Sequence, residues 1–140
     1  IGKLQTNKVK FAVQIFDYIH SVDSEKLAKK IVDEQNKINK NIKVFLQVNI
    51  GDENQKSGVN KSNVGQLAYY CKEIGLDLIG LMCIPPANID PDIYFDEMNK
   101  LNKNLNFIEL SMGMSSDFLA AVKHFSTYVR IGSSIFGQRS

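Results

Sequence analysis

Short apolar runs alternate along the chain with longer stretches in which apolar residues recur every three or four positions. The apolar runs begin near residues 18, 43, 76, 107 and 127. Each run is typical of a strand covered on both faces, because such strands are almost continuously apolar. The stretches between them are typical of amphipathic helices. This order predicts five strand–helix units and a parallel sheet.

Local signals set the boundaries of the expected helices. Ser24 precedes a helix start with acidic residues in the first turn. Gly75 favours the end of the next helix, because glycine readily adopts the left-handed conformation found there. Residues 115–117 favour the start of a later helix that contains Phe118, Leu119 and Val122. The helix that starts after Ser24 is expected to place three residues on one apolar face: Leu27, Ile31 and Ile38.

The unit length points to one of two parallel architectures, an open doubly wound sheet or a closed barrel. Strand starts follow one another at intervals of about 27 residues, so an eight-unit barrel needs about 220 residues, and the chain has 140. Ile1–Gly2 followed by a helix at 9–15 resembles the tail of a sixth unit. We therefore predict an α/β fold, a (β/α)₈ TIM-type barrel lacking about its first two strand–helix units. Residues 1–140 would form the C-terminal three quarters of that single domain.

Composition excludes several classes of protein. Lys plus Arg number 17 and Asp plus Glu 15, a net charge of +2, which carries no signature of nucleic-acid or membrane-surface binding. No apolar run approaches the roughly 20 residues of a membrane span. Cys71 and Cys83 are predicted to be free, buried thiols of a reducing compartment, so we expect a cytoplasmic protein. The chain begins at Ile1, which favours a piece of a longer gene product.

Polar residues at the carboxyl ends of the predicted strands are the candidates for a binding site, because ligands of parallel α/β proteins gather there. The turn Gly132-Ser133-Ser134 follows the last strand and leaves backbone N–H groups free. With Ser111 from the preceding strand, it suits a phosphate group. The alternative interpretation is a turn of small residues with no ligand.

Two further side chains are unusual for their positions. Arg130 stands between Val129 and Ile131 in an apolar strand, so its charge needs acceptors. A structural ion pair with a carboxylate and a contact with a ligand both remain open. His20 ends the first strand, but no His, Cys or acidic residue stands beside it at metal-ligand spacing. We predict no metal site and interpret His20 as a hydrogen-bonded histidine of the core.

Seven segments, in order along the chain, resemble one known family. They read IGKLQTNK at 1–8, IHSVD at 19–23, QVN at 47–49, KSGV at 56–59, GLMCIPP at 80–86, LSMGMSSD at 110–117 and VRIGSSIFG at 129–137. Together they resemble the pyridoxal 5′-phosphate homeostasis protein family, which is similar to the N-terminal barrel domain of alanine racemase. The resemblance covers essentially the whole chain.

The resemblance implies a barrel that holds pyridoxal 5′-phosphate (PLP) at its C-terminal mouth. Arg130 matches the arginine that faces the pyridine nitrogen, and Ser111 matches a hydroxyl donor to the phosphate. Gly132 and Ser133 match its backbone donors. Asn49 and Met82 match residues that line the cofactor: the former ends the second strand and the latter lies near the end of the third.

The implied function is PLP binding and homeostasis, a carrier role with no established catalytic reaction, so no catalytic residue is predicted. The lysine that bonds to the cofactor in this family lies upstream of Ile1, and no lysine here matches it. One alternative is therefore a barrel fragment that does not bind PLP. Another is a racemase-like PLP enzyme. The expected partner is the small-molecule cofactor alone. Intact members of the family are expected to be monomers. In this chain, the missing strands would leave two open sheet edges, which favour self-association.

Overall fold

The computed structural model of the protein describes residues 2–54 and 56–137. Five strands form a parallel sheet in the order β1-β2-β4-β5-β6. Their bounds are β1 (Tyr18–Val22), β2 (Lys43–Asn49), β4 (Asp77–Cys83), β5 (Glu109–Met114) and β6 (Tyr128–Arg130). A two-residue strand, β3 (Val59–Asn60), adds to the end of β2. All five expected strands are confirmed.

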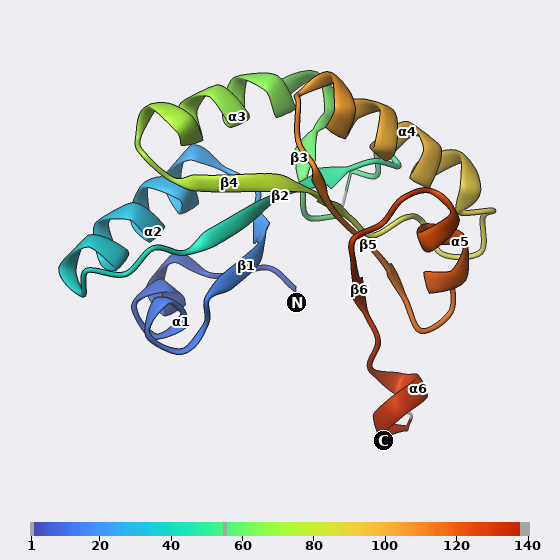
Figure 1. Ribbon diagram of the computed structural model, residues 1–140, viewed down its shortest axis with the longest axis horizontal. Helices are drawn as coiled ribbons and strands as arrows, with labels where there is room; N and C mark the ends of the chain where they lie inside the picture. The colour runs from blue at the N-terminus through green and yellow to red at the C-terminus, as the bar shows by residue number, and fades with distance from the viewer. Residues whose placement is uncertain (1, 55, 138–140) are drawn as a thin grey trace.

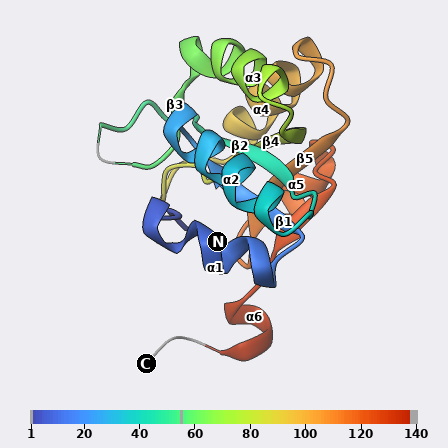
Figure 2. The same cartoon turned by 90° about the vertical axis from the view of Figure 1, so that its left-hand side faces the viewer.

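All helices but the last follow one another around the outside of a curled sheet, and the last lies beyond the end of β6 (Figure 1). Their bounds are α1 (Val9–Ile15), α2 (Glu25–Lys37), α3 (Val64–Glu73), α4 (Asp92–Asn104), α5 (Phe118–Lys123) and α6 (Ser133–Phe136), with 3₁₀ turns η1 (Thr6–Lys8) and η2 (Lys61–Asn63). Figure 2 shows α3 and α4 at the top of the molecule, with α1 and α6 at the bottom. The arrangement is a partial barrel, as predicted.

The main hydrophobic core lies between the sheet and the helices. Val44, Leu46 and Val48 alternate along β2 and pack toward this layer, which includes Leu27 of α2 and Phe95 of α4. The intervening residues of β2 point to the opposite, concave face of the sheet. Both faces of β2 are therefore buried, which explains its almost continuously apolar sequence.

A few local interactions fix the helices at their predicted boundaries. The hydroxyl of Ser24 caps α2 by accepting a hydrogen bond from the backbone N–H of Leu27 at 3.2 Å. Gly75 follows α3 with φ +77°, the conformation expected of a residue that ends a helix. On the sheet, Gly80 allows β4 and β5 to approach closely, because an added Cβ would lie 1.9 Å from the carbonyl oxygen of Glu109.

Some expectations from the sequence were wrong. Ile38 lies just beyond the end of α2 and is exposed, so it does not belong to the apolar face of that helix, whereas α5 contains Phe118, Leu119 and Val122 as predicted. Residues 2–5 form no strand, although α1 follows them as expected, and Ile1 lies outside the described residues. The amphipathic pattern therefore predicted the helices better than it predicted which of their residues are covered.

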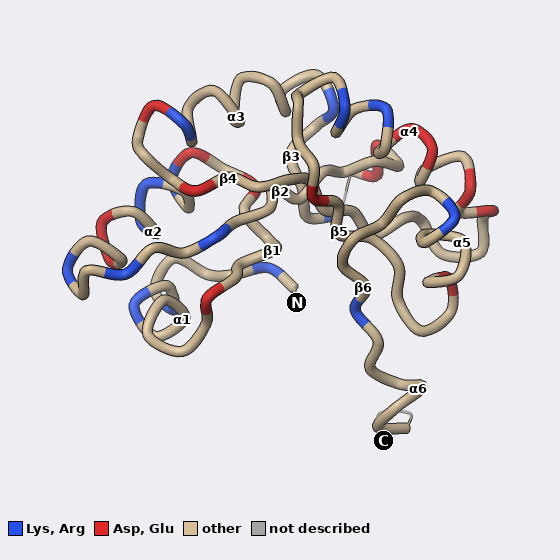
Figure 3. Tube along the Cα trace, in the orientation of Figure 1, with Lys and Arg blue, Asp and Glu red and all other residues tan. Residues whose placement is uncertain are grey.

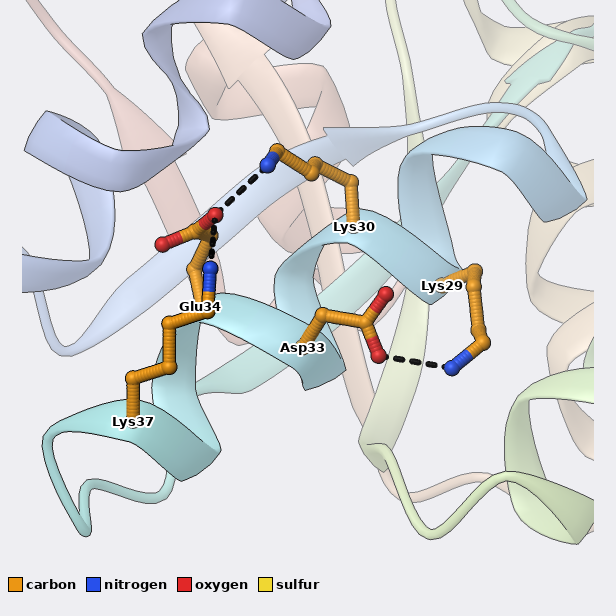
Figure 4. A network of polar contacts seen from close by, with 5 residues as sticks. All are labelled: Lys29, Lys30, Asp33, Glu34 and Lys37. Carbon is orange, nitrogen blue, oxygen red and sulfur yellow. Dashed lines mark hydrogen bonds and ion pairs between the residues drawn. The ribbon is translucent and has the colours of Figure 1, made fainter.

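Most charged residues lie along the helices and loops of the chain (Figure 3). Figure 4 shows five of the charged residues of α2, where Lys29 pairs with Asp33 at 2.6 Å, and Lys30 and Lys37 both contact Glu34. These are i,i+3 and i,i+4 pairs, in which Lys29 and Asp33 are exposed and Glu34 is buried. Within residues 2–54 and 56–137, no helix is long and apolar enough to cross a membrane.

Candidate functional site

A row of side chains crosses the concave face of the sheet. Gln47, Met82, Ser111 and Tyr128 are successive register partners on β2, β4, β5 and β6. Register partners in a parallel sheet point to the same face, so these four side chains share the inner surface. Met82 and Ser111 are both completely buried there. The topology thus places two of the predicted site residues side by side.

Arg130, at the end of β6, reaches across this row. Its Nη1 donates to the hydroxyl oxygen of Ser111 at 2.7 Å, and its Nη2 donates to the carbonyl oxygen of Cys83 at 2.9 Å. The residue is only 8% exposed. No carboxylate of the described residues forms an ion pair with it. Of the two interpretations that the sequence left open, the structural ion pair is therefore wrong.

The third nitrogen of the guanidinium is left without a partner. Arg130 Nε is buried and has no acceptor among the described residues. A buried donor without an acceptor is costly, and more so when it belongs to a charged group. Burial lowers the pKa of Arg130, yet arginine keeps its proton in proteins. The side chain also lines a cavity of about 650 Å³ shared with His20 and Tyr128. This position calls for a hydrogen-bond acceptor.

His20 completes the arrangement from β1, on the other side of the curled sheet. Its Nδ1 lies 2.8 Å from the hydroxyl oxygen of Ser111, and its ring stacks on Phe45 with centroids 4.3 Å apart. Burial, reinforced by the positive charge of Arg130, lowers the pKa of His20 to about 4. The ring is therefore neutral at physiological pH. The described residues contain no cluster suited to a metal ion.

The turn after β6 forms a second polar feature, and its serine partner is Ser115, not Ser111. The Ser115 hydroxyl oxygen accepts hydrogen bonds from the backbone N–H groups of Gly132 at 3.3 Å and Ser134 at 3.2 Å. Ser133 begins α6 within this turn, and an added Cβ on Gly132 would meet nothing within 4 Å. The turn therefore offers backbone donors next to open space.

Ser115 was not among the predicted site residues, and the reason is structural. The strand was expected to end near Ser111, whereas β5 continues to Met114. Ser111 consequently points into the concave face, while Ser115 is the first hydroxyl beyond the strand. The rule that binding residues follow strand ends would have found Ser115, had the strand end been placed correctly.

The remaining predicted residue, Asn49, is engaged in the loop that follows β2. Its Nδ2 donates to the carbonyl oxygen of Glu53 at 2.8 Å, and its Oδ1 accepts from the Glu53 backbone N–H at 3.2 Å. Asn49 also lines a small cavity with Gln47 and Lys56. Its amide thus shapes one wall of the barrel mouth through the loop it holds.

Comparisons with known proteins identify the family to which the chain belongs. The family model described as "Alanine racemase, N-terminal domain" matches residues 1–140. PipY of Synechococcus elongatus, solved without PLP, is 32% identical, with a TM-score of 0.92 over 98% of this chain and 69% of its own. A "Pyridoxal phosphate homeostasis protein" of Aquifex aeolicus is 39% identical over 99% of this chain. The chain belongs to the pyridoxal phosphate homeostasis protein family.

This member of the pyridoxal phosphate homeostasis protein family matches only part of its relatives. It covers 65% of the Aquifex aeolicus protein and 64% of a relative from Vibrio alginolyticus that is 38% identical. PipY has also been solved with PLP bound, and that structure matches with a TM-score of 0.88 at 31% identity. A D-threonine aldolase from Filomicrobium marinum, 15% identical with a TM-score of 0.75, shares the fold alone.

Proposed function

We propose that this protein binds pyridoxal 5′-phosphate through Arg130 and the turn after β6, and acts in cofactor homeostasis without a catalytic reaction of its own. The observation that carries this proposal is the buried Arg130 Nε, which has no acceptor. The name of the family and the PLP-bound structure of PipY support it. The contacts described below are noncovalent.

Arg130 suits the pyridine ring of the cofactor. An unprotonated pyridine nitrogen is an acceptor and offers no donor, and the unpaired Nε–H is its complement. Arginine cannot pass its proton to the ring, so the bound pyridine nitrogen would remain unprotonated. When bound, PLP supplies an aldehyde that condenses with amines and a ring that withdraws electrons. A ring without a proton on its nitrogen withdraws electrons weakly, which fits storage of the cofactor better than catalysis.

The turn after β6 suits the phosphate group. Gly132 and Ser134 each present a backbone N–H that now donates over 3.2–3.3 Å to the same Ser115 oxygen. A phosphate oxygen is a stronger acceptor for such donors than a hydroxyl. Ser133, within the same turn, and the Ser115 hydroxyl would complete the set. Ser111 is too deeply buried and too fully engaged with Arg130 to serve as the phosphate donor, so we assign it to holding the guanidinium.

Thermal unfolding of the chain with and without ligand tests the proposal. Pyridoxine 5′-phosphate, which has an alcohol in place of the aldehyde, is the probe of choice because it cannot condense with surface lysines. A ligand at 100 times its dissociation constant adds about 2.7 kcal/mol and raises Tm. We expect a clear upward shift for the wild type and none for Arg130→Met or Arg130→Glu.

Lys100→Met is the matched control, because it also removes one positive charge but lies exposed on α4, paired with Asp96. It should retain the full shift. A normal shift in a cooperatively folded Arg130→Met variant would show that the site is wrongly assigned. No shift in the wild type would mean that this chain does not bind the cofactor.

A further inference from the structure

We propose that His20 and Ser111 act as a positioning pair that holds the Arg130 guanidinium so that its Nε–H is presented to the aromatic ring nitrogen of the ligand. Neither residue needs to touch the ligand for this role. The inference rests on the proposed binding of PLP and adds to it a determinant of specificity for a nitrogen-containing ring. Three strands contribute: His20 from β1, Ser111 from β5 and Arg130 from β6.

The two hydrogen bonds to Ser111 have a fixed direction. Arg130 Nη1 can only donate, so the Ser111 oxygen accepts this bond at 2.7 Å. The hydroxyl hydrogen is then free to donate to Nδ1 of His20 at 2.8 Å, which requires that Nδ1 carry no proton. A neutral His20 thus keeps the lone pairs of Ser111 turned toward the arginine.

The surroundings of His20 favour the neutral ring. Phe45 stacks on it at 4.3 Å, and Tyr128 meets it edge-on at 5.7 Å. Arg130 is the charged side chain that acts on it from β6. Burial and this positive charge both oppose protonation, and the pKa of His20 falls to about 4. The direction of the hydrogen bonds is therefore constant across the physiological pH range.

The pair determines which nitrogen of Arg130 is left for a ligand. Ser111 holds Nη1, and the Cys83 carbonyl oxygen, 2.9 Å away on β4, holds Nη2. Nε is consequently the guanidinium nitrogen that remains without an acceptor among the described residues. If His20 no longer accepts from the hydroxyl, Ser111 can turn its hydrogen toward other acceptors and hold Nη1 less tightly. The Nε–H would then meet the ring nitrogen less often and at poorer angles.

Two substitutions at His20 separate this role from simple packing. Asn places an acceptor oxygen near the position of Nδ1, whereas Leu has almost the same shape as Asn and no acceptor. Both remove the ring that stacks on Phe45, so any effect of lost stacking is common to them. A difference between His20→Asn and His20→Leu therefore reports the hydrogen bond alone.

The experiment is titration calorimetry of the chain with pyridoxine 5′-phosphate, together with the ultraviolet absorbance of the bound ligand, which reports whether its ring nitrogen is protonated. We expect His20→Leu to weaken binding about fivefold, the usual scale for one hydrogen bond between uncharged groups. The bound ring nitrogen should also become easier to protonate. His20→Asn should recover most of the affinity and the wild-type spectrum.

Ser111→Ala provides a second route to the same test, because it removes the middle of the chain of hydrogen bonds with a smaller change in shape. It should weaken binding by about the same factor as His20→Leu, and the double variant should be little worse than either single one. This non-additivity is expected only if both residues act through Arg130.

The outcomes separate the two proposals. Binding by the wild type together with equal affinities and spectra for His20→Leu, His20→Asn and Ser111→Ala would overturn the positioning role and leave the proposed function standing. Equal losses in His20→Asn and His20→Leu would show that the ring serves packing only. Absence of binding by the wild type would overturn the proposed function itself, and the positioning role with it.

Discussion

Acidification should weaken the fold through His20. Its pKa is about 4 in the folded protein and about 6.5 when solvated, so between these values the unfolded chain binds more protons than the folded one. The stability contributed by the neutral ring is therefore complete above about pH 6.5 and is lost as the pH falls toward 4.

The size of this effect follows from the two pKa values. A difference of about 2.5 between them corresponds to at most about 3.4 kcal/mol of unfolding free energy. His20 is only partly buried, so screening by solvent reduces the expected loss to about 1–2 kcal/mol. For a small domain this is a substantial part of the total stability.

Urea unfolding at about pH 7 and about pH 4.5 measures the loss, with His20→Leu as the reference. Carboxylates such as Glu34, whose pKa is lowered to about 2 by hydrogen bonds from Lys30 and Lys37, also respond to acid, but equally in both proteins. The wild type should lose about 1–2 kcal/mol more than the variant over this interval.

Nuclear magnetic resonance titration of the His20 imidazole provides a direct check of its pKa. The same pH dependence of unfolding in wild type and His20→Leu would refute the reasoning. So would a His20 that titrates near its solvated value, because the direction of the hydrogen bonds to Ser111 would then reverse within the physiological range.

Two further predictions concern the core. Asn102 accepts a hydrogen bond from the Leu81 backbone N–H at 3.1 Å and donates one to the Phe107 carbonyl oxygen at 3.2 Å. Asn102→Leu should therefore lower the unfolding free energy measured with urea by about 2–4 kcal/mol and speed hydrogen exchange of the Leu81 amide. Unchanged exchange at Leu81 would contradict this prediction. Burial raises the pKa of Cys71 and Cys83 to about 12. Ellman's reagent should therefore label both thiols only as the protein unfolds. Rapid labelling of the native protein would show that the thiols are accessible and contradict this prediction.

The strands and helices were largely predictable from the sequence, because the signals that specify them lie within short stretches of the chain. The run from Lys43 to Asn49 is apolar throughout since β2 is covered on both faces, and the cap at Ser24 and the stop at Gly75 appear where their residue types require. The prediction was wrong at Ile38, which was expected on the apolar face of α2 but lies beyond the end of that helix and is exposed. Periodicity shows which residues share a face, but it does not show whether another element packs against that face.

The candidate site, like the fold, was predicted from the sequence only in part. The position of Arg130 in an apolar strand was enough to predict that it needs acceptors, and the residue types from Gly132 to Ser134 were enough to predict backbone donors. The identity of the acceptors depends on the folded structure, because Ser111 and Cys83 belong to other strands, which the curl of the sheet brings within 3 Å of the guanidinium. The same curl brings His20 from β1 to Ser111 on β5, a contact between residues 91 positions apart that no local pattern encodes.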